Sequence, residues 1–201
     1  MCSVPCVAAD PQPPAAPTIL IMGDSLSAGF GMAVASGWAS LLQQRLAAEH
    51  LPHRVVNASI SGETTSGGLS RLPQALQTHQ PEIVIIELGA NDGLRGLPLG
   101  LIENNLARMI EQCRQANAKV LLLGMRLPPN YGPRYTQEFT QVFVGLAERH
   151  NTALVPFLLT DVATRPELMQ NDGLHPNASA QQQLLDTLWP QLLRLLTRRA
   201  Q

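Results

Sequence analysis

The sequence predicts one three-layer α/β domain, in which a five-stranded parallel sheet carries helices on both faces. Five short apolar runs alternate with longer segments of helical periodicity from Thr18 onward. The runs are continuously apolar, which is typical of parallel strands buried on both faces. Repeated strand–helix units imply right-handed crossovers, which place helices on both sides of the sheet. The length of 201 residues suits one domain with a full hydrophobic core.

Each expected element follows from its own stretch of this pattern. The short apolar runs predict strands at 18–22, 55–58, 83–88, 120–124 and 153–156. The longer periodic segments predict helices at 38–49, 68–80, 99–116, 137–149 and 178–196. Irregular segments follow the strands at 23–37, 59–67, 89–98, 125–136 and 157–176. Because ligands bind outside the carboxyl ends of the strands in open α/β sheets, these five loops should share one rim, called here the site rim.

The first 17 residues differ in character from the rest of the chain. The sequence CVAA at 6–9, followed by Asp10, has the small residues of a signal-peptidase site. The proline-rich stretch 11–17 has the composition of a tether. We expect residues 1–17 to be a leader remnant or flexible tether and 18–201 to be a single domain. A periplasmic or secreted location follows from the leader.

The composition argues against several classes of function. The net charge is −1 and the only basic cluster is the pair at 198–199, which argues against a nucleic-acid partner. The apolar runs are too short to span a membrane. Lys119 is the single lysine, which disfavours phosphate-loop and Schiff-base chemistry. Three cysteines are too few and scattered for a disulfide framework or zinc site: Cys2, Cys6 and Cys113. We expect no cofactor and no metal. Because no large apolar run lies outside the expected elements, we also expect a monomer.

The expected topology selects one histidine. Four of the five precede a strand and belong at the opposite rim or at helix ends, namely His50, His53, His79 and His150. His175 alone follows the last expected strand. A histidine base on the site rim would therefore be His175.

Four segments on the site rim carry groups suited to catalysis. They are GDSLS at 23–27, NASISGET at 57–64, GANDG at 89–93 and DGLHP at 172–176. Each alone is ordinary turn chemistry, since Gly, Asp, Asn and Ser favour turns and helix caps. Together they bring to one rim the Ser25 hydroxyl, the Gly62 backbone N–H, the Asn91 amide and the pair Asp172 and His175. Acyl transfer by a serine needs such a nucleophile, base, orienting carboxylate and oxyanion donors.

These four segments, in this order, resemble the sequence blocks of the SGNH (GDSL) hydrolases, and closest to them are the family's periplasmic thioesterase, lysophospholipase and arylesterase members. The resemblance covers about residues 18–196. It implies a flavodoxin-like fold with strand order 2-1-3-4-5. It also implies Ser25 as nucleophile, His175 as base and Asp172 as its orienter. The oxyanion hole would consist of the N–H groups of Ser25 and Gly62 and the side-chain amide of Asn91.

One residue departs from the thioesterase-like pattern. The family usually has a second glycine where this chain has Ala90. A methyl group there would press on the oxyanion loop or narrow the pocket. The resemblance therefore transfers the mechanism more securely than the substrate preference.

The expected function is hydrolysis of carboxylic esters and thioesters: arylesters, acyl-CoA and lysophospholipids. Two loops that flank Ser25 mix apolar groups with one arginine each, Arg95 or Arg126, either of which could meet an anionic headgroup. The expected substrate-binding residues are Leu94, Arg95, Leu97, Leu127, Pro128 and Tyr131.

Three other functions remain open from the sequence. A carbohydrate O-acetylesterase would use the same triad with a short polar acyl pocket. A metal phosphohydrolase could use Asp24, Asp92 and Asp172, although a two-metal site needs more ligands than one histidine adds. A non-catalytic flavodoxin-like binding module is the third, since a fold alone does not determine function. Sensitivity to EDTA and reaction of Ser25 with a fluorophosphonate would separate the last two.

Overall fold

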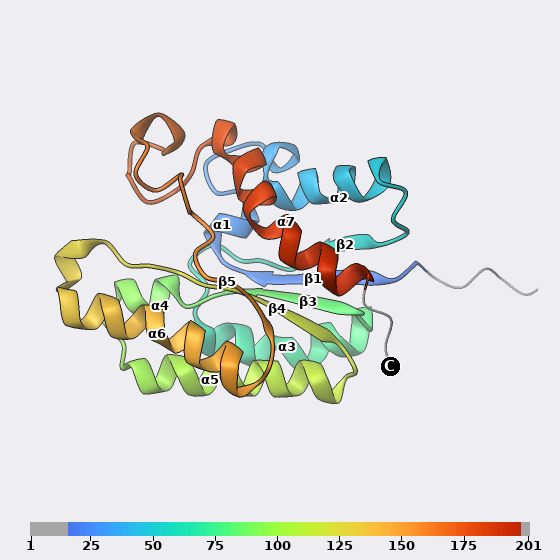
Figure 1. Ribbon diagram of the computed structural model, residues 1–201, viewed down its shortest axis with the longest axis horizontal. Coiled ribbons are helices and arrows are strands. Elements are labelled where there is room, and N and C mark those ends of the chain that lie inside the picture. Colours follow the sequence, from blue (N-terminus) through green and yellow to red (C-terminus); the bar gives the residue numbers. More distant parts are fainter. Residues whose placement is uncertain (1–15, 198–201) are drawn as a thin grey trace, which may run out of the picture.

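The computed structural model describes residues 16–197. Within them the five strands form one parallel sheet in the order second, first, third, fourth, fifth (Figure 1), as the resemblance implies. The α/β fold class predicted from the sequence is confirmed. Residues 1–15, and with them most of the expected leader or tether at 1–17, lie outside the described part.

The burial of each strand follows its place in the sheet. The strands are β1 (Thr18–Gly23), β2 (Arg54–Asn57), β3 (Ile83–Glu87), β4 (Lys119–Leu123) and β5 (Ala153–Val155). All residues of the central strands β1 and β3 are buried, whereas β2 at one edge has exposed ends. Ile19 of β1 pairs with Val55 on one side and Ile83 on the other, which aligns the apolar side chains. Burial on both faces explains why the central strands are continuously apolar.

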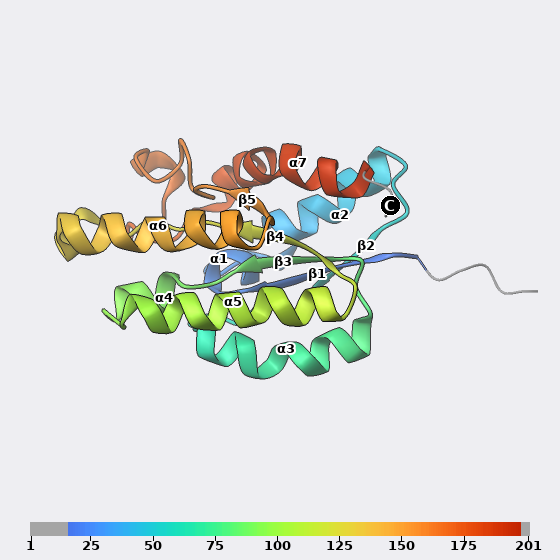
Figure 2. The ribbon, with the colours of Figure 1, turned by 60° about the horizontal axis from the view of Figure 1, so that its bottom comes forward.

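Helices cover both faces of the sheet. The helices α2 (Trp38–Ala48) and α7 (Gln181–Thr197) pack together on one face (Figures 1 and 2). On the other face lie α3 (Thr65–His79) and α5 (Leu99–Gln115). The helix α6 (Pro133–Arg149) packs beside α5 and against β4 and β5. These are the three layers that the repeated strand–helix pattern predicts.

Three helices begin at residues other than those expected. The Thr64 side chain accepts a hydrogen bond from the Gly67 N–H, and α3 therefore starts at Thr65 instead of 68. Pro133 occupies the first turn of α6 after Gly132 at φ 86°, so this helix starts four residues earlier than expected. The start of the last helix, expected at 178, is a separate 3₁₀ turn whose cap is Asn177.

Two short helices were not expected, and both follow strands on the site rim. They are α1 (Ser25–Ala28) and α4 (Ala90–Leu94), of 4 and 5 residues. A helix of barely one turn is too short to show helical periodicity in a sequence. Further single turns of 3₁₀ helix lie at Val34–Ser36, Pro129–Tyr131, Pro166–Leu168 and Ala178–Ala180.

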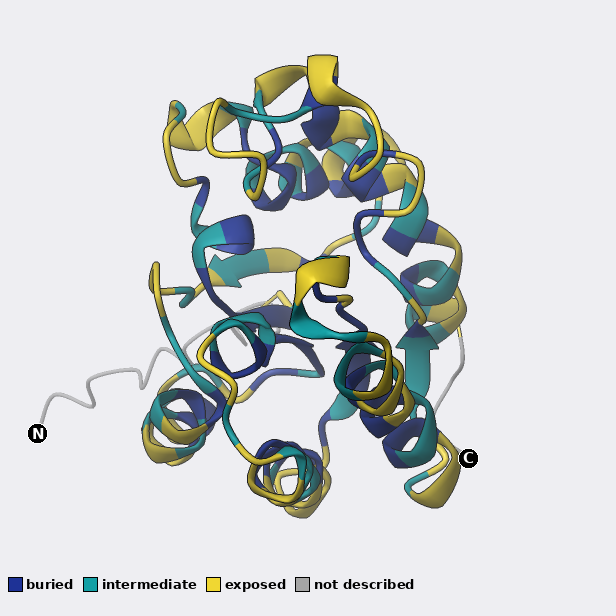
Figure 3. Ribbon diagram, turned by 90° about the vertical axis from the view of Figure 1, so that its left-hand side faces the viewer, coloured by how far each residue is buried: buried dark blue, intermediate teal, exposed yellow. Residues whose placement is uncertain are grey.

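The site rim faces the viewer in Figure 3. Buried positions gather where the helices face the sheet, and exposed positions lie on the outer surfaces of the helices and on the loops (Figure 3). Cys113, on α5, is a free, fully buried thiol in this core. In residues 16–197 no helix combines the length and apolar character that crossing a membrane requires.

Candidate active site

The turn between β1 and α1 presents Ser25. Asp24 caps α1, because its Oδ1 atom accepts a hydrogen bond from the Leu26 N–H at 3.0 Å. Ser25 is thereby the first residue of the helix, half-buried at the site rim. Its Oγ atom lies 2.9 Å from Nε2 of His175, 150 residues away in the chain.

The imidazole of His175 is held from its other side by Asp172. The Nδ1 atom of His175 lies 2.6 Å from Oδ2 of Asp172. The other carboxylate oxygen, Oδ1, accepts the backbone N–H groups of His175 at 3.0 Å and Leu174 at 2.9 Å. The hydrogen bond from the His175 backbone, with that from Leu174, lowers the pKa of Asp172 to about 2. The carboxylate of Asp172 is therefore ionised at neutral pH.

The loop that carries this pair is anchored at several points. The Gln170 N–H donates to the His175 carbonyl at 2.7 Å, and the Gln170 amide donates to the carbonyl of Phe30. The ring of Phe30 lies against the imidazole, with centroids 4.6 Å apart. Contacts of this kind hold the ring plane of His175 in one orientation.

Asn91 links the turn before Ser25 to the loop that carries Gly62. Its Nδ2 atom donates to Oδ2 of Asp24 and to the carbonyl of Glu63, each at 3.0 Å. Gly62 has φ 79°, a left-handed conformation that favours glycine, and a side chain there would meet no atom within 4 Å. The Asn91 amide thus connects Asp24, which precedes Ser25, with Glu63, which follows Gly62.

Asp92 has a different position from its neighbour Asn91. It is fully buried, and its carboxylate accepts the backbone N–H of Thr65 at 2.9 Å and its hydroxyl at 2.6 Å. It thereby joins α4 to the start of α3. Within residues 16–197, no group of three or more His, Cys, Asp and Glu side chains is arranged to hold a metal ion.

A family comparison adds to this geometry. The model of the GDSL-like lipase/acylhydrolase family matches residues 21–183, a span that includes Ser25, Asp172 and His175. The chain belongs to this family. It is therefore an ester hydrolase, in agreement with the enzyme class expected from the sequence.

Relatives of this acylhydrolase match it over most of their length. "Esterase TesA" of Pseudomonas aeruginosa is 52% identical over 92% of each chain, and the crystal structure of TesA matches with TM-score 0.87 over 89% of this chain and 99% of that one. "Thioesterase 1/protease 1/lysophospholipase L1" of Escherichia coli is 44% identical, over 90% of this chain and 86% of the relative. The esterase EstA of Pseudoalteromonas, in a structure inhibited by monoethylphosphonate, has TM-score 0.86 at 44% identity, over 90% of this chain and 99% of that one.

A cavity of about 450 Å³ opens beside Ser25 and His175 in this acylhydrolase. Three of the expected substrate-binding residues line it: Leu94, Leu127 and Pro128. Apolar side chains that the sequence reasoning did not select complete the wall, among them Met125, Phe157, Leu159 and Met169. All four belong to loops after β4 and β5, so the rule that places ligands at the carboxyl ends of strands could have found them.

The other three expected substrate-binding residues do not line the cavity: Arg95, Leu97 and Tyr131. Arg95 donates from Nη2 to the carbonyl of Gly62 at 3.2 Å. The hydroxyl of Tyr131 donates to the Leu94 carbonyl at 2.9 Å, and the hydroxyl of Tyr135 donates to the Leu97 carbonyl at 2.7 Å. These hydrogen bonds hold the segment from Leu94 to Leu97, between α4 and α5, against the neighbouring loops.

Ala90, the departure from the thioesterase-like pattern, lines the cavity next to Asn91. It is the first residue of α4 and is half-buried. The glycine before it, Gly89, has φ 113°, and a side chain there would lie 3.2 Å from the ring of Phe143. Ala90 thus contributes to the cavity wall beside the amide, while Gly89 keeps the conformation that the turn needs.

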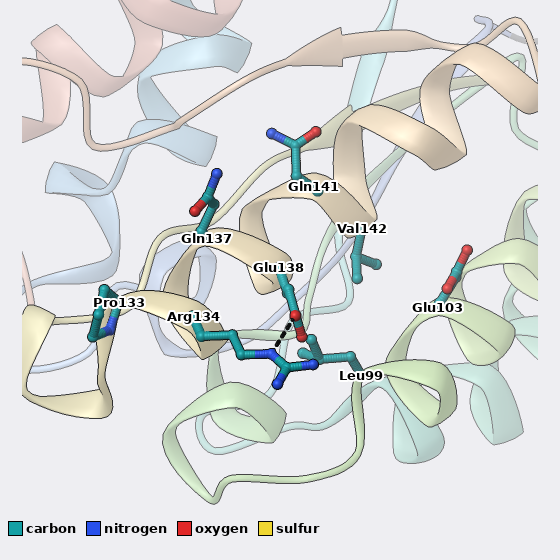
Figure 4. Close-up of a pocket in the computed structure, with 8 residues that line it drawn as sticks. All are labelled: Leu99, Glu103, Pro133, Arg134, Gln137, Glu138, Gln141 and Val142. Atoms are coloured by element: carbon teal, nitrogen blue, oxygen red, sulfur yellow. Dashed lines mark hydrogen bonds and ion pairs between the residues drawn. The ribbon is translucent and has the colours of Figure 1, made fainter.

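A second hollow, of about 730 Å³, lies between α5 and α6 (Figure 4). The side chains of Arg134 and Glu138, one turn apart on α6, form an ion pair at 2.8 Å on one wall of it. Its wall contains neither a nucleophile nor a histidine, since the lining residues are Leu99, Glu103, Pro133, Arg134, Gln137, Glu138, Gln141 and Val142. Despite its larger volume, this hollow lacks the groups needed to cleave an ester.

Proposed function

We propose that this acylhydrolase cleaves arylesters, acyl-CoA thioesters and lysophospholipids through a serine acyl-enzyme. The observation that carries the proposal is the continuous chain of hydrogen bonds from Ser25 Oγ through His175 to Asp172, at the edge of an apolar cavity. A serine hydroxyl needs a neutral base within this distance, and the base needs a partner that sets its tautomer.

The reaction proceeds in two steps. The Ser25 oxygen attacks the carbonyl carbon while His175 takes the hydroxyl proton, and the tetrahedral intermediate then expels the alcohol or thiol, which receives that proton. Water attacks the acyl-enzyme with His175 again as base, and the acid leaves as Ser25 recovers its proton. Asp172 keeps Nδ1 of His175 protonated, so that Nε2 faces the serine as the acceptor.

Asn91→Ala is expected to lower kcat by about 10²–10³-fold with a small change in KM, because the amide donates to the oxyanion mainly in the transition state. In the free protein both N–H bonds of Nδ2 are directed to Asp24 and Glu63, so the oxyanion would share one of them. Kinetics with a p-nitrophenyl ester measure the loss. Asn104→Ala, at an exposed position of α5, is the matched control. A kcat within threefold of wild type would remove Asn91 from the oxyanion hole.

The cavity favours an apolar acyl chain over an acetyl group. A volume of about 450 Å³ exceeds the space an acetyl group needs, and the wall residues near Ser25 are mostly apolar. A carbohydrate O-acetylesterase would instead need a short polar pocket. The names of relatives include esterase, arylesterase, thioesterase and lysophospholipase, which agrees with a broad acyl substrate class.

The structure favours Arg126 over Arg95 as the partner of an anionic headgroup. Arg126 lines the cavity, is exposed, and lies with its guanidinium 4.8 Å from the ring centroid of Phe157. It forms no ion pair with another residue of the described chain. Stacking on the ring fixes the guanidinium plane and leaves its N–H groups for a phosphate.

Hydrolysis of p-nitrophenyl esters from acetyl to palmitoyl is expected to peak at medium or long chains and to be insensitive to EDTA. Lysophosphatidylglycerol should be preferred to the monoacylglycerol of the same acyl chain. Arg126→Gln should raise KM for the lysophospholipid by about tenfold, the low end for a hydrogen bond to a charged group. Arg108→Gln, at an exposed position of α5, is the matched control. Activity confined to acetyl esters would favour the O-acetylesterase, and an equal effect of both substitutions would exclude the role of Arg126.

We infer that residues 18–201 act as a single domain and as a monomer. The five strands belong to one sheet with one core, which supports the single domain. A periplasmic or secreted location completes the proposal; it is supported by the small residues at 6–9, which lie outside the described part of the chain.

A further inference from the structure

Glu87 lies directly beneath the turn that presents Ser25. It is the last residue of β3, and its exposed fraction is 0%. Its Oε2 atom accepts the backbone N–H of Asp24 at 3.2 Å and the hydroxyl of Ser27 at 2.6 Å. Asp24 precedes Ser25 in the sequence, and Ser27 follows it by two residues. Glu87 therefore contacts the nucleophile's turn without contacting the space in which the substrate reacts.

The fit around this carboxyl group is close. A side chain at Gly23 would place its Cβ 2.8 Å from Glu87 Oε2 and 2.7 Å from Ser27 Oγ, so only glycine leaves room for the contact. The second oxygen of Glu87, Oε1, is buried without a hydrogen-bond partner in the described residues. A buried oxygen with no partner costs much less on a neutral acid than on a carboxylate.

Asp24 is the titratable group that faces Glu87. It is 1% exposed, and the structure shows no ion pair for either carboxyl group within residues 16–197. Burial, together with the charge of Asp24, raises the pKa of Glu87 well above its usual value. Burial also raises the pKa of Asp24 to about 6, although the Leu26 N–H, Glu87, His175 and Asn91 oppose this rise. The pKa values of both carboxyl groups are thus raised, and the unpartnered Oε1 atom favours the neutral form at Glu87.

We propose that Glu87 is a positioning residue, which as a neutral carboxyl group holds the Ser25 turn and leaves the negative charge on Asp24. The charge on Asp24 in turn anchors the Asn91 amide through the 3.0 Å contact and the start of α1 through Leu26. Glu87 thus holds the turn that carries Ser25 directly, and it holds the Asn91 amide through Asp24. This inference rests on the proposed function, because it assigns Glu87 a task in presenting Ser25.

The test compares Glu87→Gln, which keeps the shape without a charge, with Glu87→Leu, which leaves the Asp24 N–H and the Ser27 hydroxyl without a partner. Active sites are titrated with a fluorophosphonate, and kcat is expressed per titrated site so that unfolded protein is not counted. Glu87→Gln should retain at least a third of kcat at neutral pH. Glu87→Leu should lose at least tenfold in kcat with KM within about twofold of wild type.

A pH profile supplies a second measurement that a purely structural role would not change. In the wild type, ionisation of Glu87 places a second charge beside Asp24, so kcat should decline at alkaline pH. Glu87→Gln should lack this decline, whereas His175 is unchanged in both proteins. If Glu87→Leu does not fold, this comparison of wild type with Glu87→Gln still decides the question.

Three outcomes would overturn the inference. A Glu87→Gln variant with kcat tenfold or more below wild type would mean that the residue acts as a charge or supplies a proton. Wild-type kcat per site in Glu87→Leu would leave only a structural role. An inflection in the wild-type profile below neutral pH that Glu87→Gln lacks would show that Glu87 is already ionised at neutral pH. If instead Ser25→Ala retained activity, the proposed function itself would fail, independently of any result at Glu87.

Discussion

Replacing Ser25 by alanine is expected to lower kcat/KM for p-nitrophenyl esters by about 10⁴–10⁶-fold, the range typical of a lost serine nucleophile. The reason is the loss of the oxygen that we propose forms the acyl-enzyme, the atom that lies 2.9 Å from His175 Nε2. The fold should be unaffected, because Asp24 still caps α1 through the Leu26 N–H. Steady-state kinetics and thermal unfolding measure the two effects together.

The control for this experiment is Ser70→Ala, which changes an exposed serine on α3. A fluorophosphonate should label the wild type and the Ser70 variant but not the Ser25 variant. The phosphonate-inhibited structure of EstA shows that this class of reagent acts on a related esterase. Labelling and turnover that persist in Ser25→Ala would reject the serine mechanism, and with it the proposed function.

Asp172→Asn is expected to lower kcat by about 10²–10⁴-fold. The substituted amide would present an N–H group to Nδ1 of His175 and so favour the tautomer whose proton is on Nε2, facing Ser25. Asp161→Asn is the matched control, because Asp161 is exposed and has φ 60°, a conformation that asparagine tolerates. Equal activity of the Asp172 variant and the control would remove Asp172 from the mechanism.

The pH dependence of stability supplies an independent check on Asp172. Its pKa in the folded protein is about 2, below the usual 3.8, so its carboxylate contributes stability at every pH above about 4. This contribution is lost as the pH falls through the interval from about 4 to about 2. Thermal unfolding of Asp172→Asn should show a smaller loss of stability across that interval than the wild type does.

Much of the architecture was predictable from local sequence signals. The continuous apolar runs correctly indicated the central strands, because burial on both faces leaves no polar side. Helices such as α5 were found by their periodicity. The helices α1 and α4 were missed because each is too short for a period, and the start of α6 was missed because Pro133 and Gly132 determine it by backbone geometry.

Part of the site was also predictable, since parallel strands end at one rim. This rule placed Ser25, Asn91 and His175 together before any contact was known, and the structure brings Ser25 within hydrogen-bond distance of His175. It did not distinguish Arg126 from Arg95, because both lie in loops on that rim. The choice depends on side-chain direction: Arg95 bonds to Gly62, whereas Arg126 lines the cavity.

Periodicity and motif positions determine the succession of strands and helices along the chain, the rim that carries the candidate motifs, and the serine and histidine available there. The order of the strands within the sheet was implied by the family resemblance instead. The folded structure was needed for the cavity wall and for the buried carboxyl pair. Glu87 reads in the sequence as one more residue of a strand, and its contact with Asp24 spans 63 positions. Burial, charge and hydrogen bonding at such a contact depend on neighbours from distant parts of the chain, and a local sequence pattern carries no information about those neighbours.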